Sequence, residues 1–455
     1  MRYPGLAYIG SGEIAGLYGL NETIHDQKSY GLQHLYLDNY EVDYIYSALS
    51  VVELKNTCYY ADHSKPKSGH PQKAKSKTTY SKDGFCLIDE FEYHHFRKKD
   101  SVYCASDRLL IFNTTIENKT DQVLAMKVSS FVVTTKIEFE CSGKGDQILL
   151  EANGKKIRLL TQEKDVLVRV SKESPSGFMY KGIQNLMYEE NQFVDESLRG
   201  NEGFVITQTV SIYLEPKQSY TFQWALSMEE KEVDFLKIES QGKSYWKQWL
   251  KKSPYEIPDT VIANLIALKA ISLKGFIPAD LTGHYFAGDQ VCFYVRDALH
   301  GARAFLYSGF YEESKEIILL TKDLVRKKNH EMFQRYNSKL IPDEGANNNV
   351  FSQIDVIGYL LRVVADYEKI TGDLVMDVES LIKETEVLDD VSMKNGLYGP
   401  EGGVNEGVYG PAFITSTNIF IVGGLLGLLE ILRARKHPKR LKIETRIREM
   451  QKAIE

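Results

Sequence analysis

The sequence has few of the residues that mark secreted, redox-active or metal-binding proteins. Its 455 residues include only five cysteines, and no two of them form a CxxC pair. Scattered cysteines argue against a zinc site or a disulfide framework, and reduced thiols fit a cytoplasmic protein. The ten histidines show no ligand spacing, and the chain has neither a glycine-rich phosphate loop nor a Ser-His-Asp arrangement. We therefore expect a protein that uses no metal and no cofactor.

Long apolar segments and an excess of basic charge are also missing. The most apolar stretch, residues 419–432, is shorter than the roughly 20 residues that a spanning helix needs, and we interpret it as a buried helix. The N-terminus "MRYPGLAYIG" has no signal-peptide pattern. A net charge of −6 argues against a large nucleic-acid surface. We expect a cytoplasmic protein that binds neither nucleic acid nor membranes.

Residues 1–228 are rich in β-branched and aromatic residues, which occur in short runs between turn residues. Several runs alternate with period two. In "KIEFE", Ile137 and Phe139 point to one side while Glu138 and Glu140 point to the other. No long helical period interrupts the runs. This pattern predicts an N-terminal antiparallel β-sandwich made of two packed sheets.

The pattern becomes helical after residue 228. Residues 229–257 are charged with a few apolar positions and predict a helical linker that ends before Pro258. Residues 258–455 contain about seven apolar-periodic segments with short loops between them, and Gly309 is a candidate helix C-terminal cap. Because no strand–helix alternation occurs, we predict an all-α domain built from helix hairpins.

Two of the loops lead into helices that begin with polar residues. In "FYVRDALHG", Arg296 and Asp297 follow an aromatic-rich segment. Asp297 either serves the helix dipole beside a solvated Arg296, or the pair forms the floor of a sugar pocket, where aromatic faces and charged groups bind sugars. In "SQIDVIG", Gln353 and Asp355 stand at the start of an apolar helix. The alternative there is an N-cap with a buried amide.

A third loop, residues 395–418, contains six glycines, two prolines and the carboxylates Glu401 and Glu406. So long a loop inside a helical domain is usually functional, although a surface loop is the alternative. A carboxylate held among tyrosine, valine and glycine is partly desolvated. Desolvation raises its pKa and suits it to donate a proton near neutral pH.

A β-sandwich, a helical linker and helix hairpins that carry "YVRD", "SQIDVIG" and "GGVNEG" in this order resemble glycoside hydrolase family 15, the glucoamylase-type enzymes of archaea and bacteria. The resemblance implies an (α/α)6 catalytic barrel. It also implies inverting hydrolysis of terminal α-glucosidic bonds in maltooligosaccharides, starch or a related α-glucoside.

Two elements of that family have counterparts that imply substrate-binding residues. The segment that contains Tyr294, Arg296 and Asp297 is similar to the family's W-x-R-D element, with tyrosine in place of tryptophan. The segment that contains Gln353 and Asp355 resembles its Q-L-D-x-Y-G element. By this resemblance, these five residues would contact the terminal sugar.

The family's general acid lies in a W-E-E element, and Val404-Asn405-Glu406-Gly407 stands in that place. The resemblance therefore implies that Glu406 is the general acid. The tryptophan and the second glutamate of the element are missing here, so Glu401 is the alternative. No tryptophan follows Trp249, and tyrosine and phenylalanine would have to line the sugar subsites.

A complete barrel of this type has six helix hairpins, and the predicted helices fall short of that number. The resemblance therefore places the general base beyond residue 455, and we expect a partial barrel. Three hypotheses follow. A second polypeptide completes the barrel; or the chain is a helical-barrel disaccharide phosphorylase, in which phosphate replaces the base; or it is a catalytically inactive carbohydrate-binding fragment.

Overall fold

The structure is a computed structural model that describes residues 6–22, 28–55, 57–60, 63–66, 72–73, 75–171, 198–201, 203–283, 285–286, 290–328, 330–343, 354–391, 393–399 and 413–455. The chain divides into two compact units. The β unit comprises residues 1–38, 42–251 and 257–271, and the helical unit comprises residues 39–41, 252–256 and 272–455. The predicted domain ranges 1–228, 229–257 and 258–455 stay a prediction.

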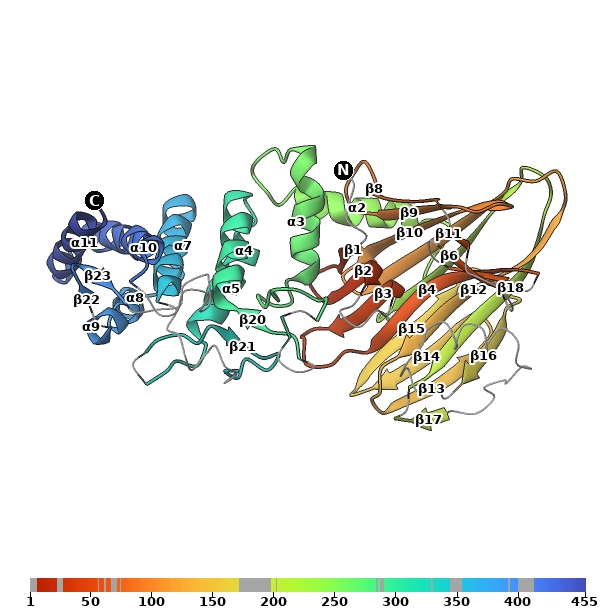
Figure 1. Cartoon of the computed structure of the whole chain (residues 1–455), viewed down its shortest axis with the longest axis horizontal. Coiled ribbons are helices and arrows are strands. Elements are labelled where there is room, and N and C mark those ends of the chain that lie inside the picture. Colours follow the sequence, from red (N-terminus) through yellow and green to blue (C-terminus); the bar gives the residue numbers. More distant parts are fainter. Residues whose placement is uncertain are drawn as a thin grey trace. The chain divides into compact units, whose positions relative to one another are not determined.

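The β unit contains two antiparallel sheets (Figure 1). The first has the strand order β1-β2-β3-β4-β12-β18-β16, and β5, β6 and β7 extend it from β4. Its strands are β1 (Leu6–Gly10), β2 (Ile14–Glu22), β3 (Lys28–Leu37), β4 (Ile45–Leu54), β5 (Thr57–Tyr59), β6 (His63–Pro66), β7 (Gln72–Lys73), β12 (Leu124–Thr134), β16 (Leu167–Ser171) and β18 (Val205–Leu214).

The second sheet has the order β17-β13-β14-β15-β19-β11-β10-β9-β8. Its strands are β8 (Lys75–Tyr80), β9 (Leu87–Glu92), β10 (Phe96–Ser106), β11 (Leu109–Asn118), β13 (Phe139–Lys144), β14 (Gln147–Ala152), β15 (Lys155–Thr161), β17 (Leu198–Gly200) and β19 (Ser219–Ser227). The predicted N-terminal antiparallel β-architecture is therefore confirmed.

Aromatic residues fill the space between the two sheets. Phe112 of β11 and Trp224 of β19 are cross-strand partners, and their rings stack with centroids 3.9 Å apart. The indole Nε1 of Trp224 donates a hydrogen bond of 2.8 Å to Oγ of Ser50 in β4. Because β4 belongs to the first sheet and β19 to the second, this bond joins the sheets inside the core. The buried indole thereby keeps its polar group satisfied.

The same core contains an ionic cluster, which we call the sandwich cluster: Lys98, Asp100, Asp89, Tyr30 and Thr114. Lys98 is fully buried and forms an ion pair with Asp100. Thr114 Oγ1 donates to Asp100 Oδ1 at 2.8 Å, and the Tyr30 hydroxyl donates to Asp89 Oδ2 at 2.8 Å. Tyr30 comes from the first sheet and the other four residues from the second. Buried charges persist when they are paired and hydrogen-bonded in this way.

Two helices of the β unit pack on its strands. Helix α2 (Ile238–Leu250) lies on β10, where Trp246 Nε1 donates to the Cys104 carbonyl at 3.1 Å. Helix α3 (Asp259–Ile271) packs on β1 and β2. A Cβ at Gly10 of β1 would lie 2.4 Å from the Ala270 carbonyl oxygen, so the close approach of α3 requires glycine at this position.

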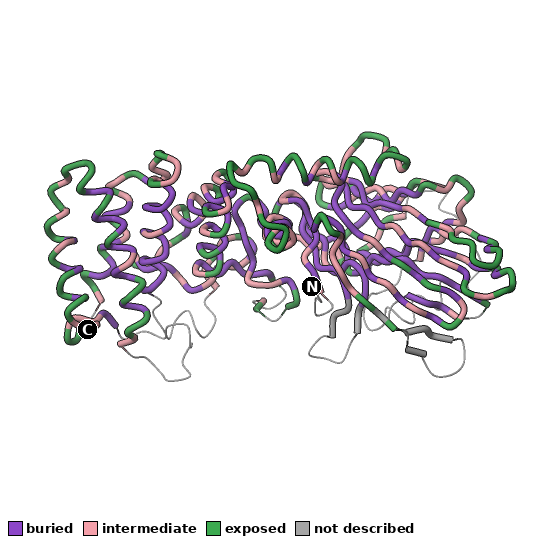
Figure 2. The backbone as a smooth tube through the Cα atoms, turned by 90° about the horizontal axis from the view of Figure 1, so that it is seen from above, coloured by how far each residue is buried: buried purple, intermediate pink, exposed green. Residues whose placement is uncertain are grey.

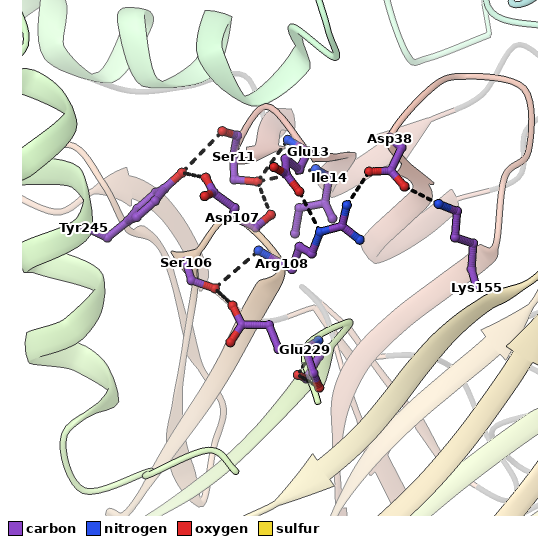
Figure 3. A network of polar contacts seen from close by, with 11 residues as sticks. Ser11, Glu13, Ile14, Asp38, Ser106, Asp107, Arg108, Lys155, Glu229 and Tyr245 are labelled. Atoms are coloured by element: carbon purple, nitrogen blue, oxygen red, sulfur yellow. Dashed lines mark hydrogen bonds and ion pairs between the residues drawn. The ribbon is translucent and has the colours of Figure 1, made fainter. Parts of the chain in front are cut away.

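Polar contacts tie the turns of the β unit to one another (Figure 3). Arg108, in the turn between β10 and β11, donates through Nε to Glu13 Oε2 and through Nη2 to Asp38 Oδ1, both at 2.6 Å. Lys155 pairs with the other oxygen of Asp38. Tyr245 of α2 donates to Asp107 Oδ1 at 2.6 Å. Each carboxylate in this network has a fixed partner, which orders the turns between strands.

The helical unit is built from hairpins, as the sequence predicts. Its helices are α4 (Val295–Tyr307), α5 (Tyr311–Lys322), α7 (Asp355–Thr371), α8 (Val378–Glu384), α9 (Val387–Asp390), α10 (Thr415–Ala434) and α11 (Arg440–Ile454). Two short strand pairs join β20 (Phe293–Tyr294) to β21 (Arg335–Tyr336) and β22 (Met393–Lys394) to β23 (Leu397–Tyr398). Gly309 follows α4 with φ +82° and turns the chain into α5, which confirms it as a C-terminal cap. The toroidal closure of an (α/α)6 barrel remains a prediction.

Helix α7 packs against α4 and α10, and glycines bring α7 and α10 close together. A Cβ at Gly424 would lie 2.5 Å from the Gly358 carbonyl oxygen. Most of α10 is buried, as Figure 2 shows, and this confirms the interpretation of residues 419–432 as a buried helix. By length and composition alone, α10 also meets the requirements for a membrane span. Three large apolar side chains of α10 are nevertheless exposed: Ile419, Phe420 and Leu426.

Candidate functional site

The candidate site lies where α4 and α7 begin. Tyr294 ends strand β20 and has extended backbone angles, and α4 starts at the next residue. The pairing of Tyr294 with Arg335 in β21 fixes the direction in which the chain enters the helix. Arg296 and Asp297 therefore occupy the first turn of α4. Backbone N–H groups in a first helical turn favour negative charge nearby.

Arg296 and Asp355 form a two-bond ion pair between the two helices, which we call the fork. Arg296 Nε donates to Asp355 Oδ2 at 2.8 Å, and Nη2 donates to Oδ1 at 3.2 Å. The side chain of Asp355 is 1% exposed and that of Arg296 is 14% exposed. Burial tends to lower the pKa of Arg296, but the Asp355 carboxylate raises it overall. A solvated Arg296, one of the two alternatives from the sequence, is thus wrong. The guanidinium is a fixed part of the unit.

Asp297 stands next to this pair and, unlike it, reaches the solvent. By surface area its side chain is exposed, yet protein atoms crowd around it and reduce its hydration. This desolvation raises the pKa of Asp297, against the opposing influence of Arg296 and His300. An exposed carboxylate beside a buried fork can accept hydrogen bonds from a ligand's hydroxyl groups without breaking the fork.

A row of rings continues from the site across three helices. His300 of α4 meets Tyr359 of α7 edge to face, with ring centroids 4.8 Å apart. Tyr359 stacks on Phe420 of α10 at 4.5 Å. Burial, followed by the positive charge of Arg303, lowers the pKa of His300, so the imidazole is neutral at pH 7. Tyr359 in the middle of the row is buried at 4% exposure, whereas His300 and Phe420 reach the solvent.

Tyr294 is held by a second cation. Its hydroxyl accepts a hydrogen bond of 3.0 Å from Arg335 Nη1, and Arg335 also pairs with Asp343. The ring of Tyr285 meets the Tyr294 ring at 5.9 Å, edge to face. The tyrosine that stands where the resembled family has tryptophan is therefore fixed at its hydroxyl by Arg335 and at its ring by Tyr285.

Four of the residues that the sequence singled out lie together at this end of the unit: Tyr294, Arg296, Asp297 and Asp355. The other three, Gln353, Glu401 and Glu406, lie outside the described residues. The roles inferred for all seven residues stay predictions. The ion pair between Arg296 and Asp355 is a contact that the sequence motifs alone do not specify.

Sequence reasoning missed His300, Tyr359, Arg335 and Asp343. A signal for the first two was present, because His300 follows Asp297 by three residues and Tyr359 follows Asp355 by four. Residues at these spacings share a helix face. Arg335 and Asp343 had no such signal, since they lie on and after a two-residue strand that only its partner strand defines. Among the residues that the structure describes, no group of three or more His, Cys, Asp or Glu could hold a metal ion.

Comparisons with known proteins give the fold a context. No protein-family model and no curated protein matches the sequence. Among solved structures, a bacterial glucoamylase in complex with acarbose matches with a TM-score of 0.68 and 12% identity, over 99% of this chain and 67% of that chain. A putative kojibiose phosphorylase from the human microbiome matches with a TM-score of 0.52 and 12% identity, over 98% of this chain and 66% of that one.

These two matches show that the chain shares the fold of a β-sandwich followed by a helical domain. The chain spans about two thirds of the length of each matched protein. At 12% identity the likeness concerns the fold alone, and it does not distinguish a glucoamylase from a phosphorylase.

Proposed function

We propose that this protein is a glucoamylase-like glycosidase that binds the terminal sugar of an α-glucoside at the start of α4 and α7. The observation that carries the proposal is the buried fork between Arg296 and Asp355 with the exposed carboxylate of Asp297 beside it. Such a site offers fixed groups for hydroxyls, and the exposed ring of His300, which Tyr359 supports from the core, offers a face for a sugar. The fold shared with a glucoamylase supports the same class of substrate.

The reaction we propose is inverting hydrolysis of a terminal α-glucosidic bond in a maltooligosaccharide or starch. Inversion needs one carboxyl group that protonates the leaving oxygen and a second that activates water on the opposite face of the sugar. We assign the acid to Glu406, with Glu401 as the alternative, from their place in the glycine-rich loop. No described residue is assigned as the base. Asp297 would hold the sugar and takes no part in proton transfer.

Phosphorolysis is the second candidate, favoured by the structural match to a putative kojibiose phosphorylase. In that reaction phosphate attacks the anomeric carbon, so no carboxylate base is needed. The same acid would protonate the leaving sugar. A third candidate is sugar binding without turnover, which requires Asp297 and the ion pair beside it but no acid.

Proton NMR of the purified chain with maltotriose and with kojibiose, in the presence and absence of phosphate, separates these candidates. Early β-glucose that disappears in Glu406→Gln supports the inverting hydrolase. Glucose 1-phosphate that forms only with phosphate assigns the phosphorylase instead. If neither product forms while sugar still binds, the chain is a binding protein. If no sugar binds, the proposed function is wrong.

A further inference from the structure

A groove of about 250 Å³ lies on the β unit, away from the face of the first sheet that packs into the core. It is formed by β4, β12 and β18, which are neighbours in that sheet. Ser50 of β4 points into the core, where it accepts the hydrogen bond from Trp224. Because side chains alternate along a strand, Glu53 of β4 points to the opposite, outer face. All residues of the groove belong to the β unit.

Strand register arranges the groove residues in two rows. Glu53, Lys127 and Ser211 stand directly opposite one another on β4, β12 and β18. Two residues along β12, Ala125 stands opposite Tyr213 of β18. The small side chain of Ala125 leaves the space between the rows open. Directly opposite residues on one face lie close enough to act on one ligand together.

The first row contains a buried carboxylate, Glu53, which lies near the positive charges of Lys127 and Arg169 but has no hydrogen-bond donor on one oxygen within the described residues. Glu53 is 8% exposed, and within the described part of the chain its Oε2 has no hydrogen-bond partner. The nearest paired cation, Lys127 Nζ, is 3.8 Å away, which is too far for a hydrogen bond. A buried acceptor without a donor destabilises the fold. A ligand hydroxyl that donates to this carboxylate would remove that penalty.

The second row offers an aromatic ring to the solvent. Tyr213 is 74% exposed. For comparison, Tyr46 of the same sheet is 37% exposed. Lys55 lines the same groove and adds a donor beside the ring. A bare ring face next to hydrogen-bonding groups is the arrangement in which one face of a sugar stacks while its hydroxyls are bound.

We propose that this groove is a second carbohydrate-binding site, which holds a stretch of glucan chain by stacking on Tyr213 and hydrogen bonds to Glu53, Lys127 and Ser211. That the ligand is a glucan rests on the proposed function. That the groove binds a ligand rests on the groove's own residues. It would keep a polymeric substrate bound to the β unit while the helical unit acts on a chain end. Short sugars that fill only the helical site would not depend on it.

Affinity electrophoresis of the full chain in gels with and without soluble starch tests this proposal. Tyr213→Ala should weaken starch affinity at least tenfold, and Tyr46→Ala, a change of the same kind on the same sheet, should leave it within twofold. Glu53→Gln keeps the shape of the side chain and should weaken affinity by a smaller factor. Starch affinity that is equal in Tyr213→Ala and in the unsubstituted chain would overturn the proposal.

Calorimetric titration of maltotriose and gels that contain a sulfated polymer, run beside the starch gels, separate this inference from the proposed function. Asp297→Asn should weaken binding of maltotriose at least tenfold but keep starch affinity through the groove. If the chain shows no turnover and no maltotriose binding, yet starch affinity still depends on Tyr213, the groove stands and the proposed function fails. Retardation by sulfated polymer, with none by starch, would mean that Lys55 and Lys127 bind anions. That result would also overturn the proposal.

Discussion

The two units each bury a cation with carboxylates, and they do so in different ways. In the sandwich cluster one lysine faces Asp100 and Asp89, and every hydrogen bond described above stays inside the core. In the helical unit one arginine meets one carboxylate, Asp355, and Asp297 beside them reaches the solvent. Buried charge alone therefore does not indicate a binding site. The exposed group next to a fixed pair makes the second arrangement available to a ligand.

The largest effect is expected when the helical pair is broken. Asp355→Ala leaves the guanidinium of Arg296 buried without its partner, which should lower the free energy of unfolding by about 3–5 kcal/mol. Urea unfolding followed by circular dichroism measures this. Glu444→Ala removes a surface carboxylate that pairs with Arg433 and Arg448 and should change stability far less. Equal losses in the two variants would contradict the account.

Breaking the sandwich cluster should also lower the free energy of unfolding, but by less than Asp355→Ala. Lys98→Met removes the cation, but Asp100 keeps the hydrogen bonds from Thr114 and Tyr30. We expect a loss on the order of 3 kcal/mol at pH 7. Adding Asp100→Asn to the same chain should recover part of the loss, because the pair is then neutral. A double variant less stable than Lys98→Met would show that the carboxylate has another partner.

The sandwich cluster should also make stability depend on pH. Burial raises the pKa of Asp89 to about 6, although hydrogen bonds from Thr78 and Tyr30 act in the opposite direction. Because this pKa exceeds the unfolded value of about 3.9, the contribution of Asp89 is fully present below pH 4 and is lost as the pH rises through 6. The free energy of unfolding that Asp89 contributes should fall by about 2–3 kcal/mol over this pH range.

Asp89→Asn should remove this dependence between pH 4 and pH 7. Unfolding free energies at closely spaced pH values, for the unsubstituted chain and the variant, measure it. Asp89 faces Asp100, Lys98 and Tyr30, so Asp100→Asn is the control for a change in the charge of its neighbour. If the unsubstituted chain and Asp89→Asn show parallel curves over this range, Asp89 does not titrate there.

A smaller effect is expected for the support of Tyr294. Tyr294→Phe removes the acceptor for Arg335 Nη1, but Arg335 keeps its pair with Asp343 at the partly exposed edge of the site. The loss of stability should be about 1 kcal/mol, and thermal unfolding measures it. A loss as large as that of Asp355→Ala would mean that Tyr294, rather than the fork, holds this end of the unit together.

Much of the fold was predictable because its signals are local. Period-two runs predicted the sandwich strands, and Gly309 ended α4 where a cap was expected. Lys98 was not predictable, since the run "FRKKDSVYC" gives no sign which of its charged residues point inward. Asp100 lies two residues along the same strand, but only the pairing of β10 with β9 and β11 brings Asp89 and Thr114 next to this pair.

The candidate site was predictable in its members but only partly in their contacts. Arg296 and Asp355 were both singled out, but they lie 59 residues apart, and the bond between them depends on how α4 packs against α7. The ring row depends in addition on Phe420 of α10, which a close approach at glycines brings near Tyr359. Contacts that arise from packing between distant elements cannot be derived from periodicity.

Calorimetric titration of maltotriose into the purified chain and into Asp297→Asn shows whether Asp297 binds the sugar. Glu312 is the matched control, because it is also an exposed carboxylate in the first turn of a helix, α5. If Asp297 holds the sugar, Asp297→Asn weakens binding at least tenfold and Glu312→Gln leaves it unchanged, while both variants stay as stable as the unsubstituted chain. Equal affinity in all three proteins would mean that Asp297 serves only its helix, and that the start of α4 is not the sugar site.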